Sequence, residues 1–97
     1  MDVRTLCLGA LMGGEATGYE IRKMFEDGTF SHFQIASLGS IYPALTKLTL
    51  DGLVTFVEHE QENRPDKKIY QLTQEGRRTF LRTLLQTRPA EDRYRSD

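Results

Sequence analysis

The sequence predicts a mainly α-helical α+β fold with one small antiparallel β-hairpin, in the order helix, helix, helix, strand, strand, helix (α-α-α-β-β-α). Two observations support this prediction. Apolar residues recur at helical spacing in four segments. Residues 53–73 contain two runs rich in β-branched and aromatic residues, with a polar stretch between them. A helix followed directly by such a hairpin is the winged helix-turn-helix arrangement.

Length and composition fit one small domain. A chain of 97 residues buries only a modest core, so help from a partner subunit would not be surprising. Its apolar runs are too short to cross a bilayer, and no signal-peptide core follows Met1, so we expect a cytoplasmic protein with no membrane partner. The net charge of −1 and the pI of about 6.1 neither support nor exclude nucleic-acid binding, because the local distribution of charge matters more.

The first helix is predicted over residues 2–12. The pair Gly13–Gly14 ends it, because glycine readily takes the left-handed conformation of a helix stop. Its core stripe is predicted to be Val3, Leu6, Cys7, Ala10 and Leu11.

The second helix is predicted to begin at Thr17, whose hydroxyl caps the helix while Glu20 reaches back, as in a capping box. It runs to about Asp27 and Gly28 closes it. Its core stripe is predicted to be Ile21, Met24 and Phe25, with Tyr19 and Lys23 on the opposite side. Residues 28–36 are predicted to be a loop anchored by Phe30, Phe33 and Ile35, with a short strand in this segment as the alternative.

The third helix is predicted to run to about Asp51 and to stop at Gly52. Pro43 lacks an N–H and so fits only the first turn. If Ser40 is the cap, Pro43 takes the third helical position at little cost, and if Ser37 is the cap, one hydrogen bond is lost. The apolar face is predicted to be Leu38, Ile41, Leu45 and Leu48. The opposite face is predicted to be Gly39, Ser40, Pro43, Thr46 and Lys47.

The hairpin strands are predicted at Leu53–Glu58 and Lys68–Thr73. Thr73 then caps a fourth helix that Pro89 ends or interrupts. The apolar edge of this helix is predicted to be Phe80, Leu81, Leu84 and Leu85. We expect a domain over residues 1–88 and a charged tail over 89–97.

Catalytic and metal-binding patterns are weak in this sequence, which predicts no enzyme, no cofactor and no metal. His32 and His59 lie 27 positions apart with no further ligand at metal spacing, so surface histidines are favoured over a metal site. Cys7 is the sole cysteine, which excludes an internal disulfide; on an apolar stripe it is expected to be an inert thiol rather than a redox sensor. Glu58, Glu60 and Glu62 alternate, and a solvated strand face is favoured over acid–base catalysis.

Binding residues are more evident. The small, polar face of the third helix could enter a DNA major groove, where Ser, Thr and Lys hydrogen-bond to base edges or phosphates. It could equally be an ordinary solvated face. Tyr42 at its edge either packs on the core or reaches a phosphate. The hairpin adds three cations, Arg64, Lys67 and Lys68, for phosphate contact, although nearby acidic residues leave a plain solvated hairpin as the alternative.

Three segments, GYEI at 18–21, SLGSIYPALTKLTLDGLV at 37–54 and KKIYQLTQEGRR at 67–78, carry a family resemblance. The chain resembles, over roughly residues 3–85, the N-terminal domain of the PadR family of transcriptional regulators. The resemblance implies a repressor that binds palindromic operator DNA as a homodimer and is released by a small-molecule effector. It also implies that the third helix reads the major groove while the wing, the β-hairpin, contacts the backbone or minor groove.

The resemblance also assigns residues to DNA binding. It implies a phosphate contact from Tyr19, wing contacts from Arg64, Lys67 and Lys68, and a reading helix that includes Ser37, Gly39, Ser40, Tyr42, Pro43 and Lys47. Family members continue into further helices that carry much of the dimer interface, so residues 89–97 are expected to begin such a region. Its partners are then double-stranded DNA and a second copy of the chain. The alternative function is a winged helix protein-interaction module that does not bind DNA.

Overall fold

The computed structural model describes residues 2–27, 38–63 and 67–86. It confirms the α+β fold class and the predicted order of helices and hairpin strands, and it adds one strand that was not predicted. The elements are α1 (Val3–Met12), β1 (Ala16–Thr17), α2 (Gly18–Asp27), the 3-10 turn η1 (Leu38–Ser40), α3 (Ile41–Leu50), β2 (Val54–His59), β3 (Lys67–Leu72) and α4 (Gln74–Gln86).

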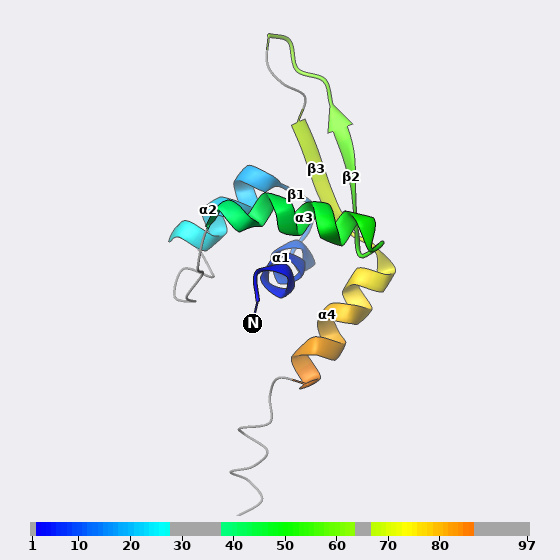
Figure 1. The fold of residues 1–97 in the computed structure, drawn as a ribbon. Helices are drawn as coiled ribbons and strands as arrows, with labels where there is room; N and C mark the ends of the chain where they lie inside the picture. Colours follow the sequence, from blue (N-terminus) through cyan, green and yellow to red (C-terminus); the bar gives the residue numbers. More distant parts are fainter. Residues whose placement is uncertain (1, 28–37, 64–66, 87–97) are drawn as a thin grey trace, which may run out of the picture.

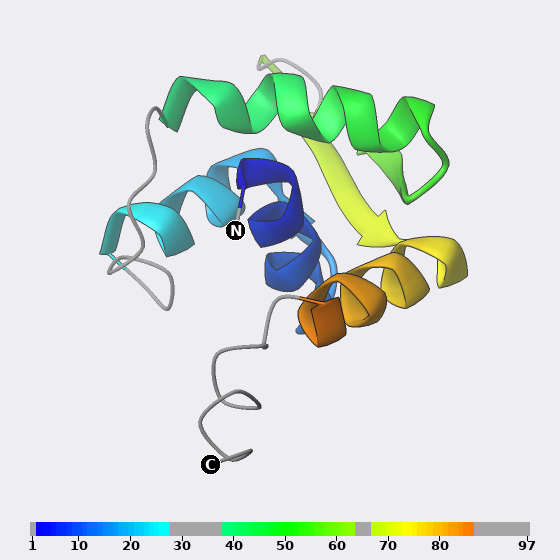
Figure 2. The ribbon, with the colours of Figure 1, turned by 60° about the horizontal axis from the view of Figure 1, so that its bottom comes forward.

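Helix α1 is the centre around which the other elements are arranged. It contacts α2, α3, α4 and β3 (Figure 2). The wing, made of β2 and β3, projects to one side of α3, while α4 extends to the other (Figure 1). The central position of α1 explains why Leu8 is buried although it lies off the predicted stripe: the helix is covered on more than one side. Val3 of that stripe is only partly buried.

The core is one apolar cluster formed mainly by the helices and the inner end of the wing. Cys7 has an exposed fraction of 0%, and burial raises the pKa of its thiol to about 12. The predicted inert thiol therefore fits its surroundings. The buried apolar residues are Leu6, Cys7, Leu8, Ala10, Leu11, Ala16, Ile21, Phe25, Ile41, Ala44, Leu45, Leu48, Val54 and Tyr70.

The capping box of α2 is confirmed. The Glu20 N–H donates to Thr17 Oγ1 over 3.1 Å, and the Thr17 N–H donates to Glu20 Oε1 over 2.8 Å. Tyr19 is 64% exposed, on the solvent side as predicted. Thr17 also belongs to β1, so the cap fixes the start of α2 next to the sheet.

Helix α3 begins after Ser40, so Pro43 takes the third helical position, as expected for that cap. The side chain of Ser40 makes no capping hydrogen bond. Pro43 occupies the third helical position, where a capping side chain usually accepts a hydrogen bond from the backbone N–H, and proline has no N–H to donate. At the other end Gly52 has a φ of 79°. The N–H groups of Gly52 and Leu53 donate to the carbonyls of Thr49 and Leu48, the paired bonds of a Schellman stop.

The sheet has three antiparallel strands in the order β1-β3-β2. Strand β1 pairs Ala16 with Tyr70 and Thr17 with Ile69, and β2 pairs with all six residues of β3. The hairpin strands lie within one residue of the predicted ranges. The expectation that Glu60 and Glu62 continue the strand alternation of Glu58 is wrong, because β2 ends at His59.

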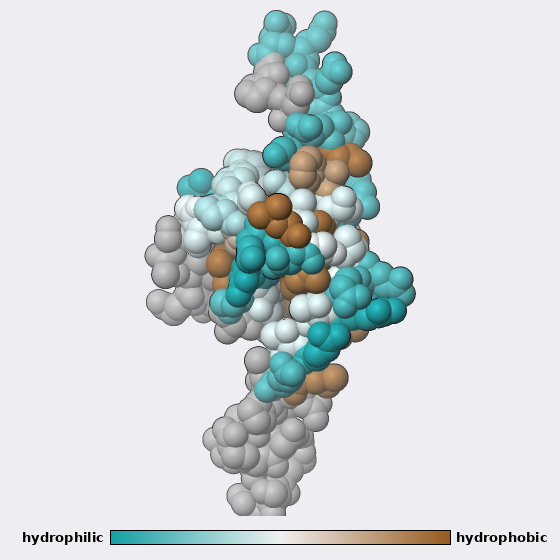
Figure 3. Space-filling view, turned by 45° about the vertical axis from the view of Figure 1, so that its right-hand side comes forward, coloured by the Kyte–Doolittle hydropathy of each residue, from teal (hydrophilic) through white to brown (hydrophobic). Residues whose placement is uncertain are grey.

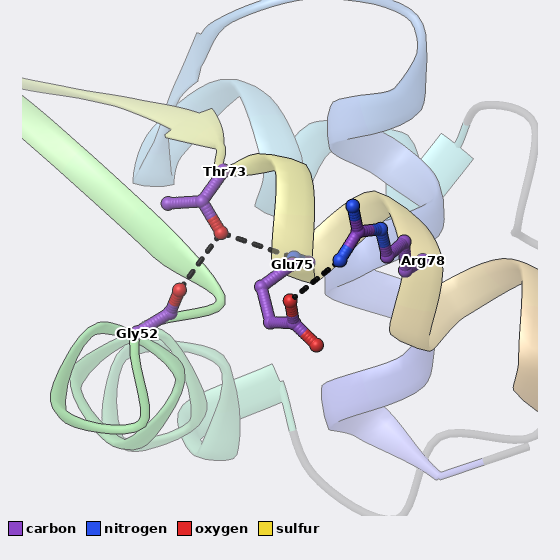
Figure 4. A network of polar contacts seen from close by, with 5 residues as sticks. Gly52, Thr73, Glu75 and Arg78 are labelled. Atoms are coloured by element: carbon purple, nitrogen blue, oxygen red, sulfur yellow. Dashed lines mark hydrogen bonds and ion pairs between the residues drawn. The ribbon is translucent and has the colours of Figure 1, made fainter.

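The start of α4 is tied to the end of α3 (Figure 4). The Thr73 hydroxyl accepts from the Gly76 N–H over 3.0 Å, as predicted for a cap, and donates to the Gly52 carbonyl over 2.8 Å. On the predicted apolar edge of α4, Leu81 and Leu85 are exposed and Phe80 is partly buried.

Several predictions lie outside the described residues. These are the loop anchors Phe30, Phe33 and Ile35, the stop at Gly28, the candidates His32, Ser37 and Arg64, and the tail from residue 89. Within the described helices, none is long and apolar enough to span a membrane.

Candidate nucleic-acid interface

The exposed face of α3 is broader and less polar than predicted. Pro43, Thr46 and Lys47 are exposed, as expected. Leu50 shares this face and is 78% exposed. At 100° per residue it falls between Pro43 and Thr46, so the same helical periodicity could have revealed it. An exposed leucine gives this face an apolar contact group beside its hydroxyl and ammonium groups.

Lys47 is paired within its own helix. Its Nζ lies 3.3 Å from Asp51 Oδ1 one turn later, and the two side chains are 56% and 39% exposed. Such an exposed pair contributes little to folding. Its consequence is electrostatic, because the carboxylate offsets part of the positive charge that α3 presents.

Tyr42 packs against the first residue of α2. A Cβ at Gly18 would collide with the Tyr42 ring and would lie 3.1 Å from its Cζ atom. Tyr42 is nonetheless 47% exposed. The predicted packing of Tyr42 is therefore confirmed for one side of the ring, which rests on α2, while the other side faces solvent. Its phosphate contact stays a prediction.

The two predicted wing lysines point to opposite faces of the hairpin. Lys68 is paired in register with Glu58 and Lys67 with His59, and neighbouring residues in a strand alternate between faces. The Lys68 face also carries Tyr70, which is buried towards the core. The outer end of the wing is hydrophilic, whereas hydrophobic atoms reach the surface near its base (Figure 3).

Lys68 lies over one aromatic ring of the wing, that of Phe56. Its Nζ lies 4.6 Å from the centroid of the Phe56 ring, within the range of a cation–π interaction. The Phe56 and Tyr70 rings meet with their centroids 5.6 Å apart at an interplanar angle of 56°. This stack positions the ammonium group beside α3 rather than at the wing tip.

A pocket of about 430 Å³ lies where α3, the wing and the start of α2 meet. We call it the α3–wing pocket; its described lining residues are Gly18, Tyr42, Thr46, Lys68 and Tyr70. Three of these, Tyr42, Thr46 and Lys68, were predicted as contact residues, and the pocket brings them together. Tyr70 was not predicted, because a buried strand residue gives no sequence signal of a polar role.

The remaining predicted contacts that the structure describes do not line this pocket. Gly39 and Ser40 lie in η1 at the start of α3, Tyr19 lies on α2, and Lys67 lies on the far face of the wing. Among the residues that the structure describes, no group of His, Cys, Asp and Glu could hold a metal ion.

Comparison with known proteins decides the family. The model of the transcriptional regulator PadR-like family matches residues 7–82. The chain belongs to this family. PadR-like proteins are transcriptional regulators, which confirms the prediction that the chain is not an enzyme.

The PadR-like chain is similar to the negative transcriptional regulator PadR of Bacillus subtilis (strain 168), with 33% identity over 90 residues, which cover 93% of this chain and 49% of the relative. A crystal structure of Bacillus subtilis PadR in complex with operator DNA matches with a TM-score of 0.75 and 36% identity, covering 84% of this chain and 45% of that one. A second, in complex with p-coumaric acid, matches with a TM-score of 0.68 and 33% identity, covering 84% and 41%. The chain thus spans about half the length of the relative.

Proposed function

We propose that this PadR-like domain binds double-stranded DNA as a transcriptional repressor, with the exposed face of α3 in the major groove and the wing beside the sugar–phosphate backbone. The α3–wing pocket carries the proposal, because it gathers hydroxyl groups of α3 and a wing ammonium group on one surface. Hydroxyl and ammonium groups are the usual donors to phosphates and base edges.

The dimensions of α3 suit this role. It has ten residues and is therefore about 15 Å long, and the major groove of B-DNA, about 12 Å wide, admits a helix. Small residues at its start, Gly39 and Ser40, favour close approach, and Thr46 and Lys47 face outward about two turns further on. The proposed contact residues are Tyr19, Ser37, Gly39, Ser40, Tyr42, Pro43, Thr46, Lys47, Arg64, Lys67 and Lys68.

Repression, dimerisation and release by an effector extend the proposal. The name of the Bacillus subtilis relative, a negative regulator, supports repression, and its complex with p-coumaric acid supports a small-molecule effector. We propose that two copies bind a palindromic operator whose half-sites lie about one helical turn apart. The exposed Leu81 and Leu85 of α4 support a homodimer interface. In this proposal residues 1–88 form the DNA-binding domain, residues 89–97 lead into a dimerisation region, and the protein acts in the cytoplasm.

A salt titration tests DNA binding. The protein encoded by the complete reading frame is mixed with a fluorescent duplex from the region upstream of its own gene, and anisotropy gives the affinity. Among the described residues few cations face the proposed DNA side, so we expect about two to four phosphate contacts per domain. For a dimer this gives about four to eight contacts and a log–log slope of about −4 to −7. Lys47→Gln is expected to weaken binding, and Arg78→Gln on α4, which removes the same charge elsewhere, is not.

Two outcomes would overturn the proposal. One is an affinity that stays flat as salt rises, since phosphate contacts release counterions. The other is the absence of DNA binding together with retention of a protein partner in nuclease-treated lysate, which would establish the protein-interaction module instead.

A further inference from the structure

We propose that the α3–wing pocket is a seat for one DNA backbone phosphate, in which the hydroxyl of the largely buried Tyr70 donates a hydrogen bond together with Tyr42, Thr46 and Lys68. This inference rests on the proposed function. It adds a contact residue from inside the sheet and places four donors around a single phosphate.

The lining of the pocket selects for an anion. Its described polar side chains are three hydroxyl groups and one ammonium group, and no carboxylate is among them. Hydroxyl groups donate to phosphate oxygens, and an ammonium group supplies charge-assisted hydrogen bonds. A volume of about 430 Å³ leaves room for a tetrahedral group that is still attached to a chain on both sides.

Tyr70 is the strongest indication of a ligand. Its side chain is only 7% exposed, yet its hydroxyl makes no hydrogen bond with any other residue that the structure describes. No described polar side-chain atom is fully buried without a partner, so this hydroxyl is open to the pocket. The residue is largely buried, but its hydroxyl at the pocket surface is free to donate a hydrogen bond to a ligand oxygen in place of water.

The protonation state of Tyr70 suits a donor. Burial, with a smaller contribution from Tyr42, raises the pKa of the Tyr70 phenol above its ordinary value of 10.0. The phenol therefore keeps its proton at physiological pH. An ionised phenol would repel a phosphate, whereas the neutral group donates to it.

The other donors are already held in place. The Phe56 ring restrains the ammonium group of Lys68 at 4.6 Å, and the absence of a side chain at Gly18 allows the Tyr42 ring to lie on the start of α2. Groups that are ordered before binding lose less conformational entropy when a ligand arrives. The pocket also lies between a groove-reading helix and the wing, where the backbone bordering the groove is expected to run.

A double-mutant cycle with modified DNA tests the seat. The probe is a duplex selected in vitro by the full-length protein, in which neutral methylphosphonates replace the phosphates one at a time. At one position in each half-site we expect affinity for wild type to fall about tenfold. Tyr70→Phe, which removes only the hydroxyl, is expected to weaken binding to unmodified DNA about tenfold and to lose most of the extra effect of that methylphosphonate. Thr46→Val and Lys68→Gln repeat the cycle from exposed positions, so one unstable variant does not decide the outcome.

The outcomes distinguish a phosphate seat from a pocket that DNA does not contact and from a site for a small carboxylate. If methylphosphonate effects in Tyr70→Phe, Thr46→Val and Lys68→Gln match those in wild type at every position, the seat is overturned although DNA binding stands. If no duplex is selected, the proposed function itself fails.

Inorganic phosphate and benzoate are titrated as free anions: weak competition with DNA agrees with a backbone seat. Tight binding of benzoate that Tyr70→Phe abolishes, with DNA affinity unchanged, would reassign the pocket to a small-molecule carboxylate.

Discussion

The hydroxyl of Thr73 donates a hydrogen bond to the carbonyl oxygen of Gly52, which joins the start of α4 to the end of α3 (Figure 4). The same hydroxyl oxygen accepts from the Gly76 N–H, and the Thr73 N–H donates to the Leu53 carbonyl over 3.1 Å. One residue thus caps a helix and fixes the chain that leads from α3 into the wing.

Removing this hydroxyl is expected to destabilise the domain. Thr73→Val keeps the shape of the side chain but loses the cap and the bond to Gly52, at a cost of about 1–2 kcal/mol. In a domain of this size that corresponds to a fall in Tm of about 4–16 °C. Thr73→Ser keeps both bonds and should stay close to wild type, and urea unfolding of the two variants measures the difference. Equal losses in both would assign the effect to packing of the methyl group.

Gly76→Ala is expected to be more damaging than its small size suggests. The new Cβ would collide with the Leu53 carbonyl, whose carbon lies 2.9 Å from the Cβ position. Backbone cannot turn aside as a side chain does, so we expect a loss of about 2–3 kcal/mol. Gly13→Ala is the matched control, because its nearest contact lies at 4.0 Å and its φ is −80°. Thermal unfolding measures the Tm of each variant. A Tm of Gly76→Ala equal to that of wild type would contradict the prediction.

Gly18→Ala is expected to separate DNA binding from folding. The three atoms nearest to the new methyl group all belong to the ring of Tyr42, which can swing outward because it is partly exposed. We expect nearly unchanged stability and a severalfold loss of DNA affinity, comparable with that of Tyr42→Ala. In a Tyr42→Ala background the glycine change should then have little further effect, since the ring that it displaces is gone. Additive losses in anisotropy measurements would show that Gly18 acts through something other than Tyr42.

Asp51→Asn is expected to strengthen DNA binding. The substitution frees Lys47 from its 3.3 Å ion pair and removes a negative charge from the end of α3, the helix proposed to contact DNA. We expect a gain of about threefold at low salt that shrinks as salt rises. Glu75→Gln removes an equal charge on α4, where it pairs with Arg78, and should change affinity less. Identical gains in the two variants would indicate an effect of net charge alone.

The buried thiol of Cys7 predicts a loss of stability in alkali. Its pKa is about 12 in the folded domain and 9.0 in an exposed reference state. Above pH 9 the unfolded chain therefore releases a proton that the folded domain keeps, and stability falls as pH rises, by at most about 1.4 kcal/mol per pH unit. Cys7→Ala should be less stable than wild type at neutral pH, but its free energy of unfolding should not show this additional decrease above pH 9. Parallel pH curves for wild type and Cys7→Ala, from urea unfolding, would contradict the assignment.

Local features of this fold were predictable from the sequence, and features that depend on distant partners were not. The capping pair Thr17 and Glu20 lies within one turn, so its residue types suffice to identify it. Strand β1 has only two residues and is specified by its partner β3, so no pattern in the local sequence reveals it.

The same distinction applies to the candidate site. The exposed face of α3 follows from helical periodicity, which also gives Leu50 when it is carried to the end of the helix. Lys67 and Lys68 point to opposite faces of the wing because neighbouring strand residues alternate. The burial of Tyr70 then shows that Lys68, two residues before it, lies on the face towards the domain. The polar role of Tyr70 requires the packing of α3 against the wing, which the linear sequence does not contain.

The pairing of β3 divides the wing into two mechanical parts. Its residues Ile69 and Tyr70 have a neighbouring strand on both sides, whereas Lys67 and Lys68 have only β2. The inner half of the wing is therefore paired with the body of the domain through β1. The outer half is held only by the pairing between its own two strands. In the proposed DNA complex, this one-sided pairing would let Lys67 adjust to the width of the groove, while the inner half keeps the rings of Phe56 and Tyr70, and with them the ammonium group of Lys68, in place.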